Sequence, residues 1–196
     1  MDNVSKNIFR TYDIRGIVGK EISDELSLNI GKAFGTYVIN NHKRVVGVSG
    51  DVRPSSPSLL DNLIKGLLSV GVKVVNFDKL PTPLSYYSLH NQKLDVEAAI
   101  QITGSHNPSE YNGFKLTFDK KPFYGDDIQL LYKIIINKDY LQGDGELITY
   151  DIISDYLEMI QEKININRKL RIAMDCGNAA GGIVAPSLYK KFNIDL

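Results

Sequence analysis

Tryptophan is absent from this chain of 196 residues, and cysteine occurs once, as Cys176. A single cysteine excludes an intrachain disulfide, and with it the disulfide-stapled frameworks of small secreted proteins. An excess of charge is missing too, because 23 basic residues balance 23 acidic ones and the formal net charge is zero. No global field favours nucleic acid or an anionic membrane, so we expect partners of neither kind.

Long apolar runs are also missing from the sequence. None approaches the roughly 20 residues that a membrane-spanning helix needs, and the first residues show no basic-then-apolar signal pattern. With the single cysteine, this favours a cytoplasmic setting. What remains is ordinary for a globular protein: 43% of residues are hydrophobic and 23% are charged.

Helix signals alternate with short apolar runs from residue 23 onward. Ser23 is typical of a helix cap, and Ser56 followed by Pro57 has the same meaning at a second helix. A third helix is expected from Asp126 to Lys138, since acidic residues before an apolar stripe are typical of a helix start. Predicted strands cover residues 44–48, 72–77 and 96–103.

A fourth predicted strand, 113–118, follows the third strand very closely. A parallel crossover needs about a dozen residues or more, so this last strand should run antiparallel as a hairpin. We therefore expect a three-layer α/β/α domain with a mixed sheet in residues 1–150. Within it, residues 140–149 are interpreted as a connector. Residues 151–196 should open a second region, with a helix over 151–164 and a buried strand over 170–175.

The segment after that strand allows an alternative function. Gly177, Ala179 and Gly182 nearly form the glycine fingerprint of a dinucleotide-binding loop, between a strand and a helix. Alanine replaces the middle glycine, whose missing side chain lets the pyrophosphate approach. A nucleotide-binding α/β domain is therefore one hypothesis for this chain.

Residues 103–108 read T-G-S-H-N-P and lie between the last two predicted strands. Gly104 permits unusual backbone angles, and Asn-Pro is a turn former. Ser105 is thereby presented on a tight polar loop at a strand's carboxyl end, where open α/β sheets place ligands. His106 and Lys115 are near enough in sequence to steer a phosphate or move a proton. A plain turn is the alternative interpretation.

A second motif lies at residues 9–16, which read F-R-T-Y-D-I-R-G. Arginine presents a rigid fork of donors that matches phosphate oxygens. The alternative is a surface strand with a turn at Gly16, in which Arg15 pairs with Asp13 or Glu21.

Taken together, F-R-x-Y-D-I-R-G and T-G-S-H-N-P-x-x-Y-N-G-F-K resemble the α-D-phosphohexomutase family, in the form of its phosphomannomutase/phosphoglucomutase branch. The resemblance implies that Ser105 carries a phosphoryl group. It donates this group to a hexose phosphate, mannose or glucose, and is rephosphorylated from a bound hexose 1,6-bisphosphate. The roles implied are catalytic for Ser105, His106, Lys115 and Arg15, and sugar-phosphate binding for Tyr12, Arg15 and Lys115.

The resemblance also implies Mg²⁺, which family members hold against the phosphoserine with a D-G-D-G-D-R loop in their second domain. That loop is absent from this sequence, since G-D-G-E at 143–146 has one carboxylate too few. Ser105 would thus meet the metal through its phosphate, with the other ligands beyond residue 196. We expect residues 1–150 to be the first family domain and 151–196 the beginning of a similar second one, inactive alone. The oligomeric state stays open, and a non-catalytic regulatory domain is a further alternative.

A phosphoserine dianion in a half-buried cleft needs cations close by. Arg15, His106 and Lys115 are the cations that the motifs supply, so we expect them to converge with Ser105 on one anion site. Arg53, in the segment D-V-R-P-S-S-P at 51–57, either faces the same cleft or packs the loop against a helix.

Overall fold

A mixed seven-stranded sheet organises the computed structural model, which describes residues 4–196. The sheet runs in the order β1 (Ile14–Ile17), β5 (Tyr111–Phe118), β4 (Ala98–Ile102), β2 (Val45–Gly50), β3 (Lys73–Lys79) and β7 (Leu147–Thr149), with β6 (Lys121–Pro122) paired to β5. β4, β2, β3 and β7 are parallel, whereas β5 is antiparallel to β1, β4 and β6. The predicted antiparallel hairpin is confirmed as β4 and β5.

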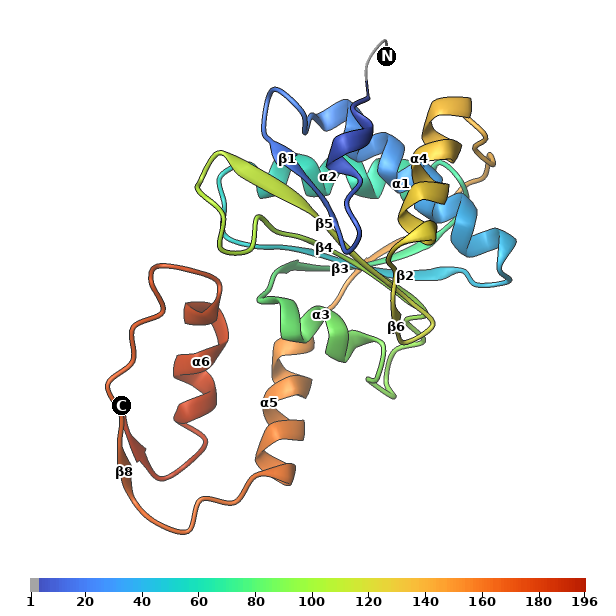
Figure 1. The fold of residues 1–196 in the computed structure, drawn as a ribbon. Helices are drawn as coiled ribbons and strands as arrows, with labels where there is room; N and C mark the ends of the chain where they lie inside the picture. Colours follow the sequence, from blue (N-terminus) through green and yellow to red (C-terminus); the bar gives the residue numbers. More distant parts are fainter. Residues whose placement is uncertain (1–3) are drawn as a thin grey trace.

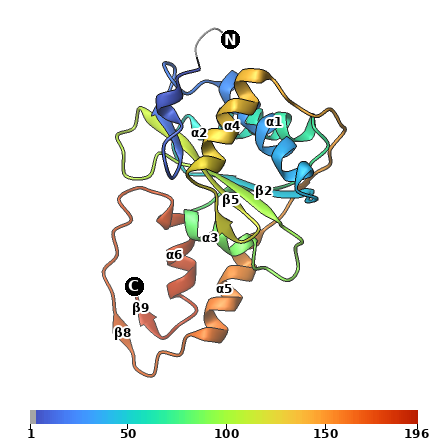
Figure 2. The ribbon, with the colours of Figure 1, turned by 45° about the vertical axis from the view of Figure 1, so that its right-hand side comes forward.

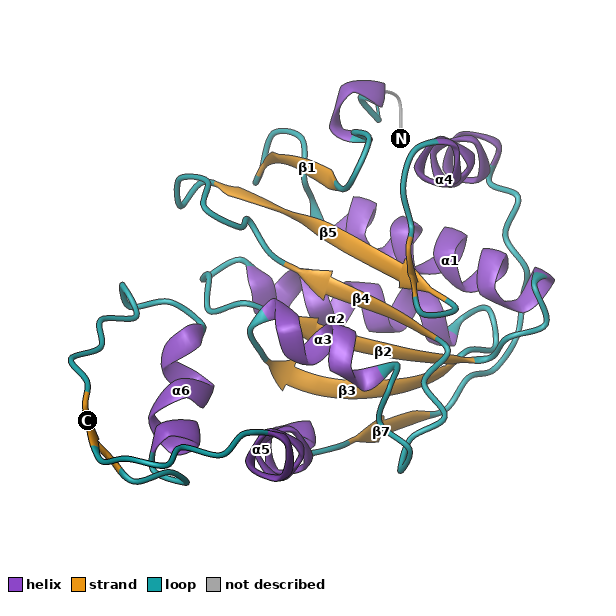
Figure 3. Ribbon diagram, turned by 60° about the horizontal axis from the view of Figure 1, so that its bottom comes forward, coloured by secondary structure: helices purple, strands orange, loops and turns teal. Residues whose placement is uncertain are grey.

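Helices cover both faces of this sheet, as Figures 1 and 3 show. The face that is uppermost in Figure 1 carries α1 (Asp24–Asn40), α2 (Ser56–Leu68) and α4 (Asp126–Asn137). The other face carries α3 (Thr82–Ser88) and α5 (Ile152–Lys163), and a short 3₁₀ helix, η1 (Lys6–Ile8), precedes β1. The expected three-layer α/β/α arrangement is confirmed.

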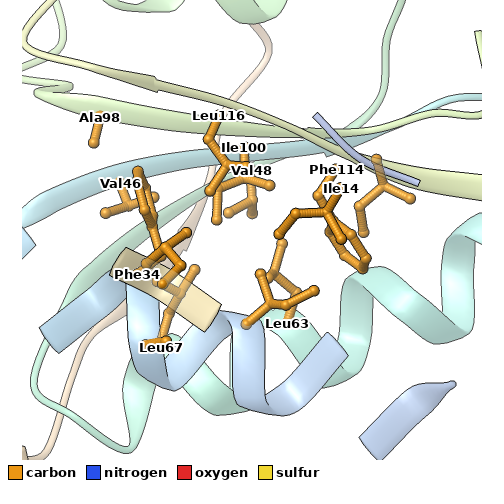
Figure 4. Close-up of a cluster of buried hydrophobic side chains, with 14 of the residues drawn as sticks. Ile14, Phe34, Val46, Val48, Leu63, Leu67, Ala98, Ile100, Phe114 and Leu116 are labelled. Carbon is orange, nitrogen blue, oxygen red and sulfur yellow. The ribbon is translucent and has the colours of Figure 1, made fainter. Parts of the chain in front are cut away.

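Strand residues alternate between two apolar cores because successive side chains point to opposite faces. Val74 packs with the α1 and α2 side, whereas the next residue, Val75, packs with the α3 and α5 side. Figure 4 shows the larger core, built by Ile14, Phe34, Val46, Val48, Leu63, Leu67, Ala98, Ile100, Phe114 and Leu116. Burial on both faces fixes the strand register, since a slip by one residue would turn each apolar side chain to the wrong core.

Local signals were correct at α1 and wrong in detail at α2. The Ser23 hydroxyl accepts a hydrogen bond from Leu26 N at 3.1 Å, which confirms the predicted cap. Ser56 is the first residue of α2 instead of its cap, a position that Ser55 takes without a side-chain bond. The Ser56 hydroxyl donates to Asp51 at 2.6 Å, so a tertiary partner has replaced the local one.

The interpretation of residues 140–149 as a connector is wrong for its last part. Leu147–Thr149 forms β7, which pairs in parallel with β3 at the sheet edge. A strand of three residues carries too little periodicity to be recognised in the sequence.

Beyond Asp151 the chain leaves the sheet and lies below it in Figure 2. α5 packs on α3, α6 (Gly181–Tyr189) packs on α5, and β8 (Leu170–Arg171) pairs in parallel with β9 (Ile194–Asp195). The buried strand expected over 170–175 is only two residues long, and none of those six residues is buried. An apolar strand is buried only where other elements cover it, and β9 is its one strand neighbour among residues 4–196. No helix in this described range is long and apolar enough to cross a membrane.

Candidate functional site

Ser105 lies just beyond the carboxyl end of β4, on an exposed loop. Its φ angle is +55°, in the left-handed region that residues with a side chain rarely adopt. Its backbone N–H donates to Thr103 Oγ1 at 2.9 Å, and its hydroxyl oxygen lies 3.4 Å from Nδ1 of His106. Such a conformation costs on the order of 1–3 kcal/mol, so the surrounding contacts must hold it.

Arg53 supplies most of those contacts. Its side chain is 14% exposed, and the guanidinium donates to the backbone carbonyls of four residues around the loop, at 2.7 to 3.2 Å: Ser105, Asn107, Pro108 and Tyr111. The sequence left two alternatives for Arg53, facing the cleft or packing the loop, and the structure shows both. Arg53 lines the same cleft as Ser105, and it also binds the loop backbone.

Asp51 supports the loop from below. It is buried, and its carboxylate accepts hydrogen bonds from Arg53 Nε at 3.2 Å and from Gly104 N at 3.2 Å. The same carboxylate accepts from Ser56 at the start of α2. One buried charge therefore joins the end of β2, the start of α2 and the Ser105 loop.

Gly104 is needed for a different reason from the one that the sequence suggested. The left-handed backbone angle expected at Gly104 occurs at Ser105 instead. A Cβ atom added to Gly104 would lie 2.4 Å from Cζ of Arg53 and 2.7 Å from the carbonyl oxygen of Tyr111. Glycine is therefore required here by close packing against the guanidinium.

Arg15 and Lys115 meet at the carboxylate of Asp13. Arg15 Nη2 donates to Asp13 Oδ2, and Lys115 Nζ lies 3.6 Å from the same oxygen. The side chains of Arg15 and Asp13 are only 14% and 9% exposed, so the predicted pair exists but is not a surface pair. Glu21 takes another partner and accepts from Ile17 N at 2.9 Å.

The register of β1, β5 and β4 relates this pair of cations to the Ser105 loop. Arg15 is opposite Gly113, whose carbonyl accepts from Thr103 N at 2.9 Å. Lys115 is opposite Gln101 on β4, four positions before Ser105. Opposite residues share a face, so both cations are on the face away from α1 and α2. The structure thus joins Arg15 on β1 to Lys115 on β5, and it joins Ser105 to His106 on the loop that follows the neighbouring strand, β4.

Tyr12 stands somewhat apart from these residues. Its side chain is 74% exposed, and its ring stacks on Tyr124, with ring centroids 6.2 Å apart. Among residues 4–196 the structure records no contact between Tyr12 and Ser105.

An open cleft of about 440 Å³ lies between the Ser105 loop and a second loop from the other end of the chain. Arg53, Ser105 and Asn107 line one side, and residues 177–180 line the other. Gly177 and Asn178 both have positive φ angles, +57° and +53°, and lead into α6. No motif indicates that these two loops face each other, because only the tertiary fold brings them to the same cleft.

The described residues do not form a magnesium site by themselves. Between residues 4 and 196 no group of three or more His, Cys, Asp or Glu side chains is arranged to hold a metal ion. Asp126 and Asp127 open α4, as predicted. Asp51, the carboxylate that contacts the Ser105 loop, is already engaged by Arg53 and Ser56.

Comparisons with known proteins agree with this geometry. The family model described as "Phosphoglucomutase/phosphomannomutase, alpha/beta/alpha domain I" matches residues 6–142. A phosphomannomutase/phosphoglucomutase of Pseudomonas putida is 36% identical over 190 residues, which are 97% of this chain and 41% of the relative. A phosphoglucomutase of Neisseria meningitidis serogroup B is 35% identical over 192 residues, again 97% and 41%. The chain therefore spans about two fifths of the length of these curated relatives.

Solved structures show the same relationship. A phosphoglucomutase/phosphomannomutase family protein from Burkholderia thailandensis matches with a TM-score of 0.93 and 36% identity, over 98% of this chain and 44% of that chain. A putative phosphomannomutase from Thermus thermophilus matches with a TM-score of 0.78 over 99% of this chain and 46% of that chain. At 20% identity, this second likeness bears on the fold alone.

Proposed function

Because this chain belongs to the phosphoglucomutase/phosphomannomutase family, we propose that it is the N-terminal part of a cytoplasmic phosphohexomutase that interconverts hexose 1-phosphates and hexose 6-phosphates. The observation that carries the proposal is the Ser105 hydroxyl, exposed on a strained loop whose backbone is held from several sides. Mannose and glucose phosphates are the proposed substrates, since relatives are named for both sugars or for glucose alone.

In the proposed reaction, phospho-Ser105 gives its phosphoryl group to the free hydroxyl of a hexose phosphate. The bond from phosphorus to the serine oxygen breaks and a bond to the sugar oxygen forms, while the proton of the sugar hydroxyl is transferred to the serine oxygen, which becomes a hydroxyl again. The hexose 1,6-bisphosphate then reorients and returns its other phosphoryl group to Ser105, so the enzyme is unchanged. His106 and Lys115 are the two candidates for moving the proton, and both lie on or near the Ser105 loop.

Arg15 and Lys115 are proposed to stabilise the phosphate charge. A phosphoserine adds about −1.5 to −2 charge at neutral pH. Arg15 Nε is buried and has no hydrogen-bond partner among the described residues, which leaves a donor that an anion would satisfy. The carboxylate of Asp13 forms ion pairs with both Arg15 and Lys115 and so holds the two cations in place.

Mg²⁺ would supply further charge neutralisation when bound. Within this chain we propose one ligand for it, the phosphate on Ser105, because the described residues offer no carboxylate cluster beside the loop.

The test uses the full-length protein that contains this chain. Ser105→Ala should lower turnover of glucose 1-phosphate and mannose 1-phosphate by at least about 10³-fold, because it removes the atom that carries the phosphoryl group. Ser109→Ala is the matched control, since Ser109 is an exposed serine lining the same cleft. Near wild-type turnover in Ser105→Ala would contradict the proposal.

Two further measurements separate the alternatives. Mass spectrometry of the purified full-length protein should find phosphate on Ser105, whereas a non-catalytic regulatory domain would carry none. A nucleotide-binding domain would instead bind ADP or NAD at residues 177–182, which calorimetry would detect.

A further inference from the structure

Arg53 uses every N–H of its guanidinium to hold the Ser105 loop. Nε donates to Asp51, Nη1 donates to two carbonyls and Nη2 donates to two others, which accounts for the five donors that an arginine side chain has. The four carbonyls belong to the segment from Ser105 to Tyr111, more than fifty positions away in the sequence. One planar group thus fixes the curvature of the entire loop.

We infer that Arg53 is a positioning residue for the phosphoryl-carrying serine. It holds Ser105 in its left-handed conformation and aims the hydroxyl into the cleft, while it does not bind the sugar phosphate itself. This inference rests on the proposed function, because it assigns to Arg53 the task of placing the atom that reacts.

The contrast with Arg15 supports this division of roles. Arg15 has a donor, Nε, without a partner among the described residues, whereas Arg53 has no N–H left for an anion. Gly104 lies so close to the Arg53 guanidinium that even a methyl group would collide with Cζ. A phosphate therefore has no route to this side chain from the Gly104 side.

The geometry also requires arginine in particular. Lysine has three donors around a single nitrogen and no flat surface, so it cannot bridge Asp51 and four carbonyls. Arg53→Lys would keep the charge and lose most of the loop contacts. This substitution therefore separates the effect of charge from the effect of positioning.

The experiment compares the full-length wild type with Arg53→Lys and with Arg171→Lys as the matched control. Arg171 also pairs with a carboxylate, Asp195, at 3.5 Å, but its side chain is 88% exposed and lies on β8. In Arg53→Lys we expect kcat on glucose 1-phosphate to fall about 10²-fold, as for a reacting group displaced by about 1 Å. KM should stay within about threefold, because positioning acts on the transition state more than on substrate binding.

Hydrogen exchange gives a readout that does not depend on activity. Amide exchange in residues 103–111 should become faster in Arg53→Lys, and exchange in the strands and helices should stay as in the wild type. Arg171→Lys should change neither kcat nor exchange in that segment. If Arg53→Lys fails to fold, Gly104→Ala tests the same contact, since its Cβ would meet the guanidinium at 2.4 Å.

Three results would overturn the inference. A raised KM with unchanged kcat would mean that Arg53 binds substrate. Faster exchange throughout the domain would mean that it only supports folding, and unchanged exchange in residues 103–111 would mean that it does not fix the loop. If the wild type has no mutase activity, the proposed function fails, while the exchange data still decide whether Arg53 holds the loop.

Discussion

Residues 4–150 and residues 152–196 differ in what their elements pack against. The first region contains the seven-stranded sheet, all of the larger apolar core and most of the smaller one. The second has two helices and one pair of two-residue strands, and its buried residues are Ile152, Asp155, Leu157 and Val184. The first region therefore has the contacts of an independent folding unit, and the second depends on contacts with it.

The polar part of the attachment between the two regions is the carboxylate of Asp155 in α5, which lies beside the apolar contacts of the smaller core. It accepts hydrogen bonds from Asn91 Nδ2 at 2.7 Å, Lys93 Nζ at 2.5 Å and Tyr150 Oη at 2.8 Å. Burial pushes the pKa of Asp155 up, but the hydrogen bonds from these donors outweigh it and hold the pKa below the ordinary 3.8. The first region is thus held by its own apolar cores, whereas the second is attached to it by apolar side chains in the smaller core and by one charged group.

The largest effect that we predict is the loss of activity when these two regions stand alone. The 196-residue chain with added Mg²⁺ and hexose 1,6-bisphosphate should show no turnover of glucose 1-phosphate. The reason is that residues 4–196 provide no carboxylate cluster for the metal, and its charge neutralisation is among the largest contributions to phosphoryl transfer. A coupled assay against the full-length protein checks this, and turnover by the 196-residue chain would contradict it.

Phe114→Ala should destabilise the first region. Phe114 is fully buried between β5 and the α1 and α2 side, so its loss leaves a cavity that should cost about 3–5 kcal/mol of unfolding free energy. Val184→Ala in α6 is the matched change in the second region. It should leave the main transition in urea within about 0.5 kcal/mol, because the second region should open before the sheet unfolds. A loss from Val184→Ala in the main transition clearly above about 0.5 kcal/mol would show that both regions unfold as one unit.

Local signals explain how much of this fold could be predicted. The Ser23 cap and the short connection before β5 each depend on neighbours in the sequence, and both predictions are confirmed. β7 could not be predicted, since three residues at a sheet edge are defined by their pairing with β3 and not by a pattern of their own.

The candidate site shows the same limit. The motif T-G-S-H-N-P locates Ser105 and its loop in the sequence. The ion pair between Arg15 and Asp13 was one of the predicted alternatives. Loop packing by Arg53 was one of two predicted alternatives, but its four partners were not predictable, because they are backbone carbonyls with no sequence signature. The facing of residues 177–180 toward Ser105 is likewise set by how α5 and α6 pack.

Asp155→Asn should weaken the attachment of the second region. Replacing the carboxylate with an amide sets N–H groups against the donors on Asn91 and Lys93, at a cost of about 1–3 kcal/mol at neutral pH. Because the folded pKa lies below the unfolded value, the wild-type advantage is fully present above pH 3.8 and is lost as the pH falls through the folded pKa. Hydrogen exchange of α5 as a function of pH measures this.

Glu158→Gln is the control for that experiment. Glu158 also lies near Lys93, at 3.7 Å, but its side chain is 62% exposed, so its loss should have little effect. An advantage of the wild type over Asp155→Asn that persists unchanged well below pH 3.8 would contradict the assignment to the carboxylate.

The smallest effect is expected at the end of α4, where Lys138 has a left-handed backbone with φ +57° and ψ +32°. The side chain is exposed, and the left-handed conformation costs an ordinary residue roughly 1–2 kcal/mol. Glycine removes this strain but loses more entropy on folding, by about 0.5–1 kcal/mol, so Lys138→Gly should stabilise the first region by about 0.5 kcal/mol. Asn178→Gly, at φ +53° in the second region, should leave the main urea transition where it is, since asparagine tolerates this conformation and the loop lies outside the sheet. A gain from Asn178→Gly equal to that from Lys138→Gly would mean that residues 177–180 unfold together with the sheet, and the contrast between the two regions would then be lost.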